Sequence, residues 1–525
     1  MVNTKLARCL SAHTSCVNAL AISPDGRWLA SGGDADPCIL LWDFHQDDLL
    51  APSEGLRGPR ANVFALTFSP SGRHLVSGDA SNGVLKYDLH GLSTTSIELM
   101  LPTESYMTHS NSIRAVSFHP QSDDVFLSAS EDGRIVMHDS RSDQRMSRAQ
   151  STVQKATEFT GCQFHPEAPG IFLTSEANGQ VCLRDTRMAF GPLNSRSNDG
   201  IVQQASQELF LSYVTKIGKP KVSYVTQPDA SSAVFDRTGT KFAITFRGYL
   251  PTIYSIDDPN PVATCFARYL PDGTPVPPGK RTYANTSTMK HGSFGGPGLD
   301  RDEYYSAGSE DFCGYVWEIP EVQTLKQRRE IVSDTSFYGR DPATVGEADS
   351  LALIITEYLI SSGFASNSGG ERCIPVELHT PLSRLGGHRS IVNTTLFHPN
   401  WPFVLTAGVE RHIMLHSASS NTPCAVDLTP TTKEVRDLPE PSVLDRQRAL
   451  EASTAGPLIP RPWPELDDSD DSRTIALFDE ILRREQDFDV FRSRMLYGLD
   501  DDYYSMFGDG HAHMDDDSDD AMYLT

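Results

Sequence analysis

A short pattern that recurs along the chain constrains the fold more than any other feature of the sequence. Each copy begins with an apolar strand ending in a Ser-Pro, His-Pro or Asp-x-x-Gly turn, followed by an apolar strand ending in small residues. After an Asp-Gly or similar turn, a third strand closes with an aromatic residue and an acid, as in the clearest copy, His13 to Asp43. Recurrence of this kind predicts one supersecondary unit that is stacked against copies of itself.

Seven copies of the pattern can be recognised, and the last three are more degenerate than the first four. The first four close at Asp43, Asp88, Asp139 and Asp185, so successive closing acids are 45, 51 and 46 residues apart. This is slightly longer than the roughly 40–45 residues of a four-stranded propeller blade. Short antiparallel strands must bury one face and leave no exposed edge, and closure of a ring satisfies both demands. We therefore expect an all-β fold, a seven-bladed β-propeller over residues 1–420.

Two segments interrupt the repeat. Residues 188–228 separate copies four and five, and we expect a surface excursion there with strands near 209–213 and 222–225. A longer insertion, about 321–384, separates copies six and seven. Such insertions project from a propeller, where they either contact partners or are simply tolerated.

Within the longer insertion, the apolar residues of 350–360 favour a short helix or strand. The next stretch, 361–370, is rich in Ser and Gly and is typical of a flexible loop. The insertion is therefore expected to combine one regular element with irregular chain.

The repeat stops after about Ala418, and residues 421–525 are rich in Asp, Pro and Ser. This tail carries 25 acidic and 10 basic residues, so it holds −15 of the net charge of −24. We expect it to be acidic and largely disordered. A helix at about 472–497 is predicted from a rough apolar stripe that includes Ile475, Phe478 and Leu482. It either docks on the propeller, forms transiently or binds a partner.

Charge and cysteine content exclude several classes of protein. The net charge of −24 disfavours a protein that grips phosphate backbones, so direct nucleic-acid binding is not expected. The nine cysteines are scattered and form no C-x-x-C pair, which is typical of reduced thiols in the nucleus or cytoplasm. The longest apolar run, near 351–355, is too short to span a membrane, so we expect an intracellular protein with no membrane contact.

No catalytic constellation stands out in the sequence. The histidines are not spaced as metal ligands, and no Ser-His-Asp or paired-carboxylate arrangement is visible. We therefore expect no enzyme activity, no cofactor and no metal site.

The residues directly after the closing acid distinguish copies three and four from the others. Copy three ends His138-Asp139-Ser140-Arg141 and copy four ends Arg184-Asp185-Thr186-Arg187, whereas copies one and two have no Arg two residues after the acid. A guanidinium donates several hydrogen bonds in a fixed fork and keeps its charge at physiological pH. Arginine is also enriched among the residues that dominate protein interfaces. The tandem motif therefore predicts a docking surface, although arginines that merely cover the rim of a blade would give the same pattern.

The repeat resembles the WD40 family, and the tandem motif resembles the W-D-x-R box of the WD40-repeat substrate receptors of cullin-four ubiquitin ligases. The match departs from that box because His138 and Arg184 replace its Trp. Further stretches are similar and collinear with one branch of these receptors, that of the fifth cullin-four-associated factor. They are Cys16-Val17-Asn18-Ala19, Thr288-Met289-Lys290, Gly308-Ser309-Glu310-Asp311-Phe312, Gly387-His388-Arg389-Ser390-Ile391-Val392-Asn393 and Ala476-Leu477-Phe478-Asp479-Glu480-Ile481-Leu482-Arg483-Arg484-Glu485.

The resemblance implies roles for particular residues. The residues that would dock the propeller adaptor, the damage-specific DNA-binding protein subunit one, are Asp139, Arg141, Asp185 and Arg187. Those that would tie blade three together by hydrogen bonds are His109, Ser128 and Asp132. Residues 5–10 would supply the outer strand of the last blade and so close the ring.

These residues lead to a hypothesis of function. The chain would be the non-catalytic substrate-recognition subunit of a cullin-four RING ubiquitin ligase, and it would present an unknown protein substrate while other subunits transfer ubiquitin. The alternative is a general WD40 scaffold or chromatin-associated interaction module without a ligase role. The sequence identifies neither the substrate nor the surface that recognises it.

Overall fold

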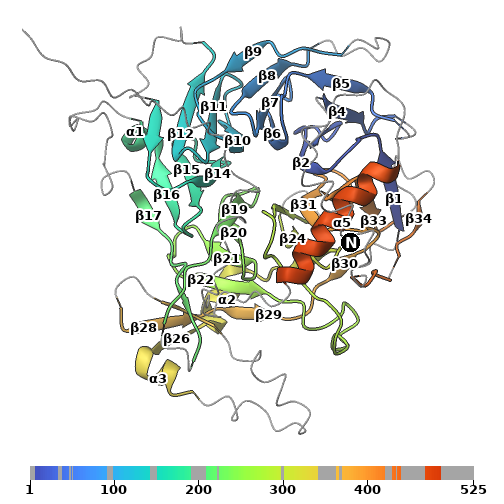
Figure 1. Ribbon diagram of the computed structural model, residues 1–525. Coiled ribbons are helices and arrows are strands. Elements are labelled where there is room, and N and C mark those ends of the chain that lie inside the picture. Colours follow the sequence, from blue (N-terminus) through green and yellow to red (C-terminus); the bar gives the residue numbers. More distant parts are fainter. Residues whose placement is uncertain are drawn as a thin grey trace, which may run out of the picture. The chain divides into compact units, whose positions relative to one another are not determined.

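The structure is a computed structural model, and it describes residues 6–33, 38–46, 49, 51–90, 99–141, 151–190, 209–220, 224–296, 301–340, 362–365, 369–419, 428–432, 434–438 and 468–485. Most of the strands in these stretches form sheets that stand as blades around a common axis (Figure 1). Blades are numbered below in chain order, and their strands are named from the axis outwards.

The first four blades share one plan, in which consecutive strands pair antiparallel. Their strands are, in blade one, β2 (Val17–Ile22), β3 (Trp28–Gly33), β4 (Cys38–Asp43) and β5 (Glu54–Arg57); in blade two, β6 (Val63–Phe68), β7 (His74–Asp79), β8 (Val84–Asp88) and β9 (Glu104–Tyr106); in blade three, β10 (Ile113–Phe118), β11 (Val125–Ser130), β12 (Arg134–Asp139) and β13 (Thr152–Gln154); and in blade four, β14 (Phe159–Phe164), β15 (Ile171–Glu176), β16 (Val181–Asp185) and β17 (Leu209–Ser212).

The last three blades draw strands from distant parts of the chain. Their strands are, in blade five, β19 (Ala230–Phe235), β20 (Lys241–Phe246), β21 (Thr252–Ser255), β22 (Pro261–Cys265) and β29 (Val376–Leu378); in blade six, β23 (Gly292–Gly295), β24 (Tyr304–Gly308), β25 (Gly314–Glu318) and β30 (Ser383–Leu385); and in blade seven, β31 (Val392–Phe397), β32 (Phe403–Gly408), β33 (Glu410–Ser417), β1 (Leu6–Ser11) and β34 (Thr429–Pro430).

The blades close into a ring. Their innermost strands contact one another in the order β2, β6, β10, β14, β19, β23 and β31, and β31 contacts β2 again. The ring is closed by β1, which pairs antiparallel with β33 so that Leu10 lies opposite Ile413. This confirms the expected seven-bladed propeller. The closing strand expected at residues 5–10 is found at Leu6–Ser11, although β34 and not β1 is the outermost strand of blade seven.

The insertions contribute more order than the sequence suggested. The segment 188–228 was expected to be an excursion, yet its strand β17 pairs with β16 and completes blade four. Of the strand expected at 222–225, residues 222 and 223 lie outside the described residues, Tyr224 and Val225 are not in a strand, and Thr226 forms an isolated bridge to Ile217. The insertion at 321–384 ends in β30, the outermost strand of blade six, and therefore lies within that blade.

An accessory sheet forms beside the ring from both insertions. It is made of β18 (Ile217–Gly218), β27 (Gly363–Ala365), β28 (Glu371–Ile374) and β26 (Glu330–Ser333), accompanied by the helices α2 (Val322–Arg328) and α3 (Asp334–Tyr338). The expectation of a loop over 361–370 is wrong at Gly363–Ala365, because the fully buried Phe364 anchors a strand there. The element expected at 350–360 lies outside the described residues.

Parts of the acidic tail pack on the propeller. After β34, residues 434–438 and the helix α5 (Asp468–Glu485) are described. The predicted helix at about 472–497 coincides with α5 as far as Glu485, and its remainder lies outside the described residues. The same holds for the disorder expected elsewhere in 421–525. Among the helices that the structure describes, none is long and apolar enough to cross a membrane.

The closure strand gives a first prediction. Leu10 is 1% exposed within the core shared by blades seven and one. We expect Leu10→Ala to lower the free energy of unfolding by about 2–5 kcal/mol, because it removes buried apolar contacts and leaves a cavity at the closure. Urea denaturation measures this. Ser11→Ala, which changes the exposed neighbour on the same strand, is the matched control and should leave the midpoint unchanged.

Candidate docking surface

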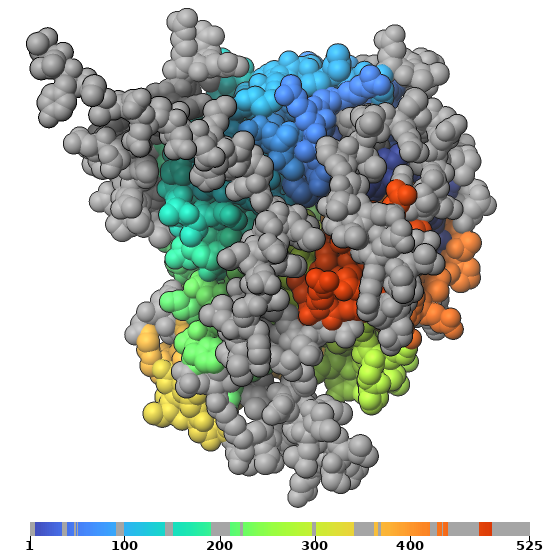
Figure 2. All heavy atoms as spheres, in the orientation of Figure 1, coloured from blue at the N-terminus to red at the C-terminus, as the bar shows by residue number. Residues whose placement is uncertain are grey.

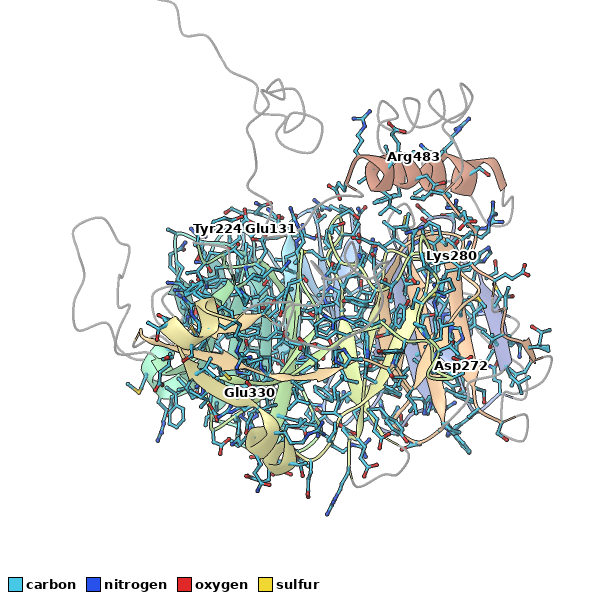
Figure 3. The ribbon with its side chains drawn as sticks, turned by 90° about the horizontal axis from the view of Figure 1, so that it is seen from below. Glu131, Tyr224, Asp272, Lys280, Glu330 and Arg483 are labelled. Carbon is cyan, nitrogen blue, oxygen red and sulfur yellow. The ribbon has the colours of Figure 1, made fainter. Side chains whose placement is uncertain are left out.

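The antiparallel plan of the blades divides the propeller into two faces. In each blade the turn from first to second strand and the connection from third to fourth strand lie at one end. The turn from second to third strand and the link to the next blade lie at the other. Every closing acid is therefore on one face, called here the arginine face after Arg27, Arg73, Arg141 and Arg187. The opposite face is called the helix face, because α5 lies above the edge of the ring that carries Glu131 and Lys280 (Figure 3).

Blade three holds its Arg close to its closing acid. Arg141 Nε donates to Asp139 Oδ1 at 3.0 Å and Nη2 donates to Oδ2 at 2.9 Å. The backbone N–H of Arg141 also donates to Asp139 Oδ1 at 3.0 Å, so the carboxylate fixes both the turn and the guanidinium. The hydrogen bond from Arg141 lowers the pKa of Asp139.

Blade four repeats the same arrangement. Arg187 Nε and Nη2 donate to the two oxygens of Asp185 at 3.1 and 2.7 Å. Asp185 also caps the short helix α1 (Thr186–Ala189) by accepting from the backbone N–H of Arg187 at 2.9 Å. The guanidinium of Arg187 lowers the pKa of Asp185. Two consecutive blades therefore present arginines in one geometry on one face.

Blades one and two also pair their closing acids with arginines, which the sequence motif did not predict. Arg27 donates to both oxygens of Asp43 at 3.1 and 2.8 Å, and Arg73 donates to both oxygens of Asp88 at 3.2 and 2.9 Å. These arginines immediately precede the second strand instead of following the third. The sequence did contain a signal for these arginines. A Gly-Arg pair, Gly26-Arg27 and Gly72-Arg73, occurs at the same position in the first two copies of the repeat.

Exposure separates the two kinds of arginine. The side chains of Arg27 and Arg73 are 37% and 53% exposed, whereas those of Arg141 and Arg187 are 63% and 85% exposed. A partner that approaches the arginine face therefore meets Arg141 and Arg187 most fully. Arg27 and Arg73 form the same ion pair and provide matched controls.

Acidic residues gather on the arginine face beyond blade four. A cavity of ≈ 880 Å³ lies between blades five and six on this face, and its lining includes Asp236, Asp257, Asp302, Glu318 and Glu321, as well as Lys241 and Arg301. The arginine pairs of blades one to four and this acidic stretch together give the face an uneven charge. Such patterns set the orientation and the rate of protein association more than its strength.

Inside blade three, the residues singled out from the sequence lie in one chain of hydrogen bonds. His109 Nδ1 lies 3.1 Å from Asp132 Oδ2, and His109 Nε2 lies 2.7 Å from Ser128 Oγ. Ser128 Oγ in turn lies 2.8 Å from His138 Nε2. With Nδ1–H of His109 donating to Asp132, Ser128 donates to His109 and accepts from the Nε2–H of His138. These hydrogen bonds connect the loop before β10 with β11, β12 and the turn between them.

Blades one and seven repeat this chain with other side chains. In blade one the indole Nε1–H of Trp42 donates to Ser31 Oγ at 3.0 Å. In blade seven His416 Nε2 lies 2.9 Å from Thr406 Oγ1, which lies 2.7 Å from His388 Nε2. A neutral histidine with its proton on Nε2 therefore performs the task of the indole N–H. Burial lowers the pKa of His138 to about 3 and keeps it neutral.

The structure shows no metal centre in the stretches that it describes. No group of three or more His, Cys, Asp or Glu side chains within those stretches is placed to hold a metal ion.

Comparison with known proteins supports the interpretation of the repeat. The family model described as WD domain, G-beta repeat matches residues 4–43, 52–88 and 101–139. These segments lie in the part of the chain that forms blades one to three and the closure strand. Together with the ring of antiparallel sheets, the match makes the fold a WD40 β-propeller.

Individual relatives extend the likeness beyond the repeats. The chain is 24% identical over 485 residues to the DDB1- and CUL4-associated factor 5 of Mus musculus, and equally to that of Homo sapiens, over 91% of this chain and 40% of those proteins. It is 33% identical over 136 residues to Protein ALTERED SEED GERMINATION 2 of Arabidopsis thaliana, over 25% of this chain and 18% of that protein. The chain thus resembles a factor whose name states association with DDB1 and CUL4, and spans about two fifths of its length.

The buried histidine of blade three gives a prediction on pH. Its pKa is about 3 in the folded chain and 6.5 in the unfolded chain. The unfolded chain therefore takes up the proton first, and stability is lost as pH falls from about 6.5 towards about 3. For one such group the loss between pH 7.5 and pH 5 is about 2 kcal/mol. His138→Trp keeps the N–H donor to Ser128 and should remove this share of the acid sensitivity.

Urea midpoints at pH 7.5 and pH 5 measure the effect. His90→Trp, a change at an exposed histidine, should keep the wild-type dependence on pH. An unchanged dependence in His138→Trp would show that His138 is already protonated in the folded chain, or that the blade opens around it.

Proposed function

We propose that this propeller is the non-catalytic substrate-recognition subunit of a cullin-four RING ubiquitin ligase. It docks the propeller adaptor, the damage-specific DNA-binding protein subunit one, through the arginine face. Arg141 and Arg187 make the principal contacts, while Asp139 and Asp185 orient them. Other subunits of the ligase transfer ubiquitin.

The observation that carries the proposal is the repeated geometry of two neighbouring blades. Each guanidinium donates hydrogen bonds to both carboxylate oxygens of the Asp two residues before it, and each side chain remains largely exposed. Because the Asp already restricts the side chain, less rotamer entropy is lost when a partner binds the remaining N–H donors. The likeness to the DDB1- and CUL4-associated factor 5 over 91% of this chain supports the identity of the partner.

The expected partners, cofactor requirement and cellular compartment derive from this role. The partner on the adaptor side is a protein and the ligand to be presented is a protein substrate, so neither a cofactor nor nucleic acid is required. A receptor of this kind works in the nucleus, the cytoplasm or both. The second candidate is a general WD40 scaffold or chromatin-associated module. In that case the ion pairs of Arg141 and Arg187 would only stabilise the ends of their blades.

Binding of the purified adaptor distinguishes the two candidates. We expect the double variant Arg141→Ala/Arg187→Ala to lose at least about 2–4 kcal/mol of binding free energy, or roughly 30-fold or more in Kd, as buried interface arginines do. Biolayer interferometry with immobilised adaptor measures this. Circular dichroism and a melting curve establish that the variant is folded.

The matched control is Arg27→Ala/Arg73→Ala, which removes two ion pairs of the same geometry from blades one and two. We expect it to bind the adaptor within a few fold of wild type. Equal losses in both double variants would indicate that the ion pairs only stabilise the rim. Absence of binding by the wild-type chain would leave the scaffold as the better interpretation.

Conservative replacement separates charge from geometry. Lysine keeps the positive charge but lacks the planar fork, so Arg141→Lys/Arg187→Lys should recover less than half of the binding free energy that the alanine variants lose. The same interferometry assay measures it. Full recovery by lysine would show that the adaptor senses only the charge of this face, and would contradict the fork geometry proposed here.

A further inference from the structure

The helix α5 is amphipathic, and its apolar side faces the propeller. Ile475, Ala476 and Leu482 are buried, and Phe478 is half-buried on the same side. The spacings of three, four and seven residues among Ile475, Phe478 and Leu482 place these three on one face of a helix. The helix therefore lies on the ring through a defined stripe of side chains.

The surface below this stripe is built by loops of blades six, seven and one on the helix face. Leu482 and Phe478 belong to one hydrophobic cluster with Cys16, Phe312, Ile391 and Val409 from the ring and with Val435 and Leu438 from the segment 434–438. This set is called here the α5 groove. Figure 2 looks onto the helix face and shows α5 in red above it.

An ion pair joins α5 to the residues of the groove. Arg436 Nη1 and Nη2 donate to the two oxygens of Asp479 at 3.0 and 2.7 Å, and Asp479 is 4% exposed. Arg436 Nε donates to the backbone carbonyl of Arg389, which fixes the guanidinium to the ring. The groove thus selects a carboxylate at one position between apolar side chains.

The floor of the groove is held in a strained backbone conformation. Phe312 has φ of +68° and is fully buried, with the guanidinium groups of Arg281 and Arg436 4.3 and 4.4 Å from its ring centre. The equivalent turn position is Gly133 in blade three and Gly179 in blade four, which adopt the same left-handed conformation without strain. A bulky residue adopts this left-handed conformation only where the surrounding contacts offset its energetic cost. Such positions concentrate at binding sites.

We propose that the α5 groove is a helix-recognition site, occupied in cis by α5, that binds an amphipathic helix of a partner protein once α5 is displaced. The matching helix carries apolar residues at positions one, four and eight and a carboxylate at position five, as Ile475, Phe478, Leu482 and Asp479 do. That the partner is the ligase substrate rests on the proposed function. The groove itself does not depend on it.

The structure supports this occupant through charge and connectivity. The groove already holds a helix of the stated pattern, and Arg436 forms an ion pair with Asp479 of that helix. The helix joins the ring through residues 439–467, so covalent linkage raises its effective concentration at the groove. A partner helix competes with that linkage, which keeps the groove closed until the partner is abundant or α5 is released.

A labelled peptide of residues 468–485, titrated against full-length chains by fluorescence anisotropy, tests the proposal. In the chain variant Asp479→Arg, the cis helix places a cation against Arg436 and should leave the groove. We expect this chain to bind the wild-type peptide at least tenfold more tightly than the wild-type chain does. A peptide that itself carries Asp479→Arg should not bind.

The chain variant Glu480→Arg is the matched control. Glu480 neighbours Asp479 but forms its ion pairs within α5, with Arg483 and Arg484, so its loss should not open the groove. Charge reversal gives an independent check. The chain variant Arg436→Asp should bind the Asp479→Arg peptide and reject the wild-type peptide.

Two results would overturn the proposal. One is a folded Asp479→Arg chain and a folded Arg436→Asp chain that bind neither peptide. The other is loss of cooperative unfolding in both chains, which would make α5 a permanent part of the fold. Adaptor binding is read separately, and since α5 and the arginines lie on opposite faces, the Asp479→Arg chain should bind adaptor as the wild type does. If the wild-type chain did not bind the adaptor at all, that result would contradict the proposed function. It would not bear on whether the groove binds a helix.

Discussion

The pairing of β1 with β33 is the interaction on which the rest of the structure depends. A propeller blade alone is a small sheet with exposed hydrogen-bonding edges and two unburied faces. The blades bury these faces only against one another, so the ring is stable only when its first and last blades are joined. Leu6–Ser11 supplies that joint by entering the sheet of blade seven, and Thr429–Pro430 adds a further pairing on its outside. Both ends of the repeat region are thereby tied into one sheet.

Within each blade the fixed requirement is an N–H donor aimed at a buried hydroxyl, and an indole is only one way to meet it. Trp42 supplies the donor to Ser31, and His138 supplies it to Ser128. In blade four Arg184 Nε donates to Thr174 Oγ1 at 3.1 Å. An unsatisfied buried hydroxyl costs about 1–3 kcal/mol, which explains why each substitute is itself a donor. A histidine in this place acquires a buried charge when it is protonated, so the substitution makes the blade sensitive to acid.

The sequence predicts those features whose partners lie at fixed positions of the repeat. Alternation of apolar residues sets the register of β10 to β12, and the register alone brings Ser128 and Asp132 towards His109. Features that join distant segments escape such reasoning. The outer strand β17 comes after a long insertion, Arg27 and Arg73 lie outside the tandem motif, and Asp479 is 43 residues from Arg436. The amphipathic stripe of α5 was visible in the sequence, but an amphipathic stripe does not identify the surface that covers it.

The antiparallel topology of the blades places the arginines and the α5 groove on opposite faces of the propeller. Antiparallel strands place every closing acid, and hence Arg141 and Arg187, at one end of the blades, while the loops that build the α5 groove lie at the other. A partner at the arginine face therefore leaves the groove accessible, and a helix in the groove leaves the arginines accessible. The blades between the faces are closely packed, so binding at one face alters affinity at the other only if it changes the position of a blade. Simultaneous and largely independent occupation of both faces is the arrangement that a bridging subunit requires.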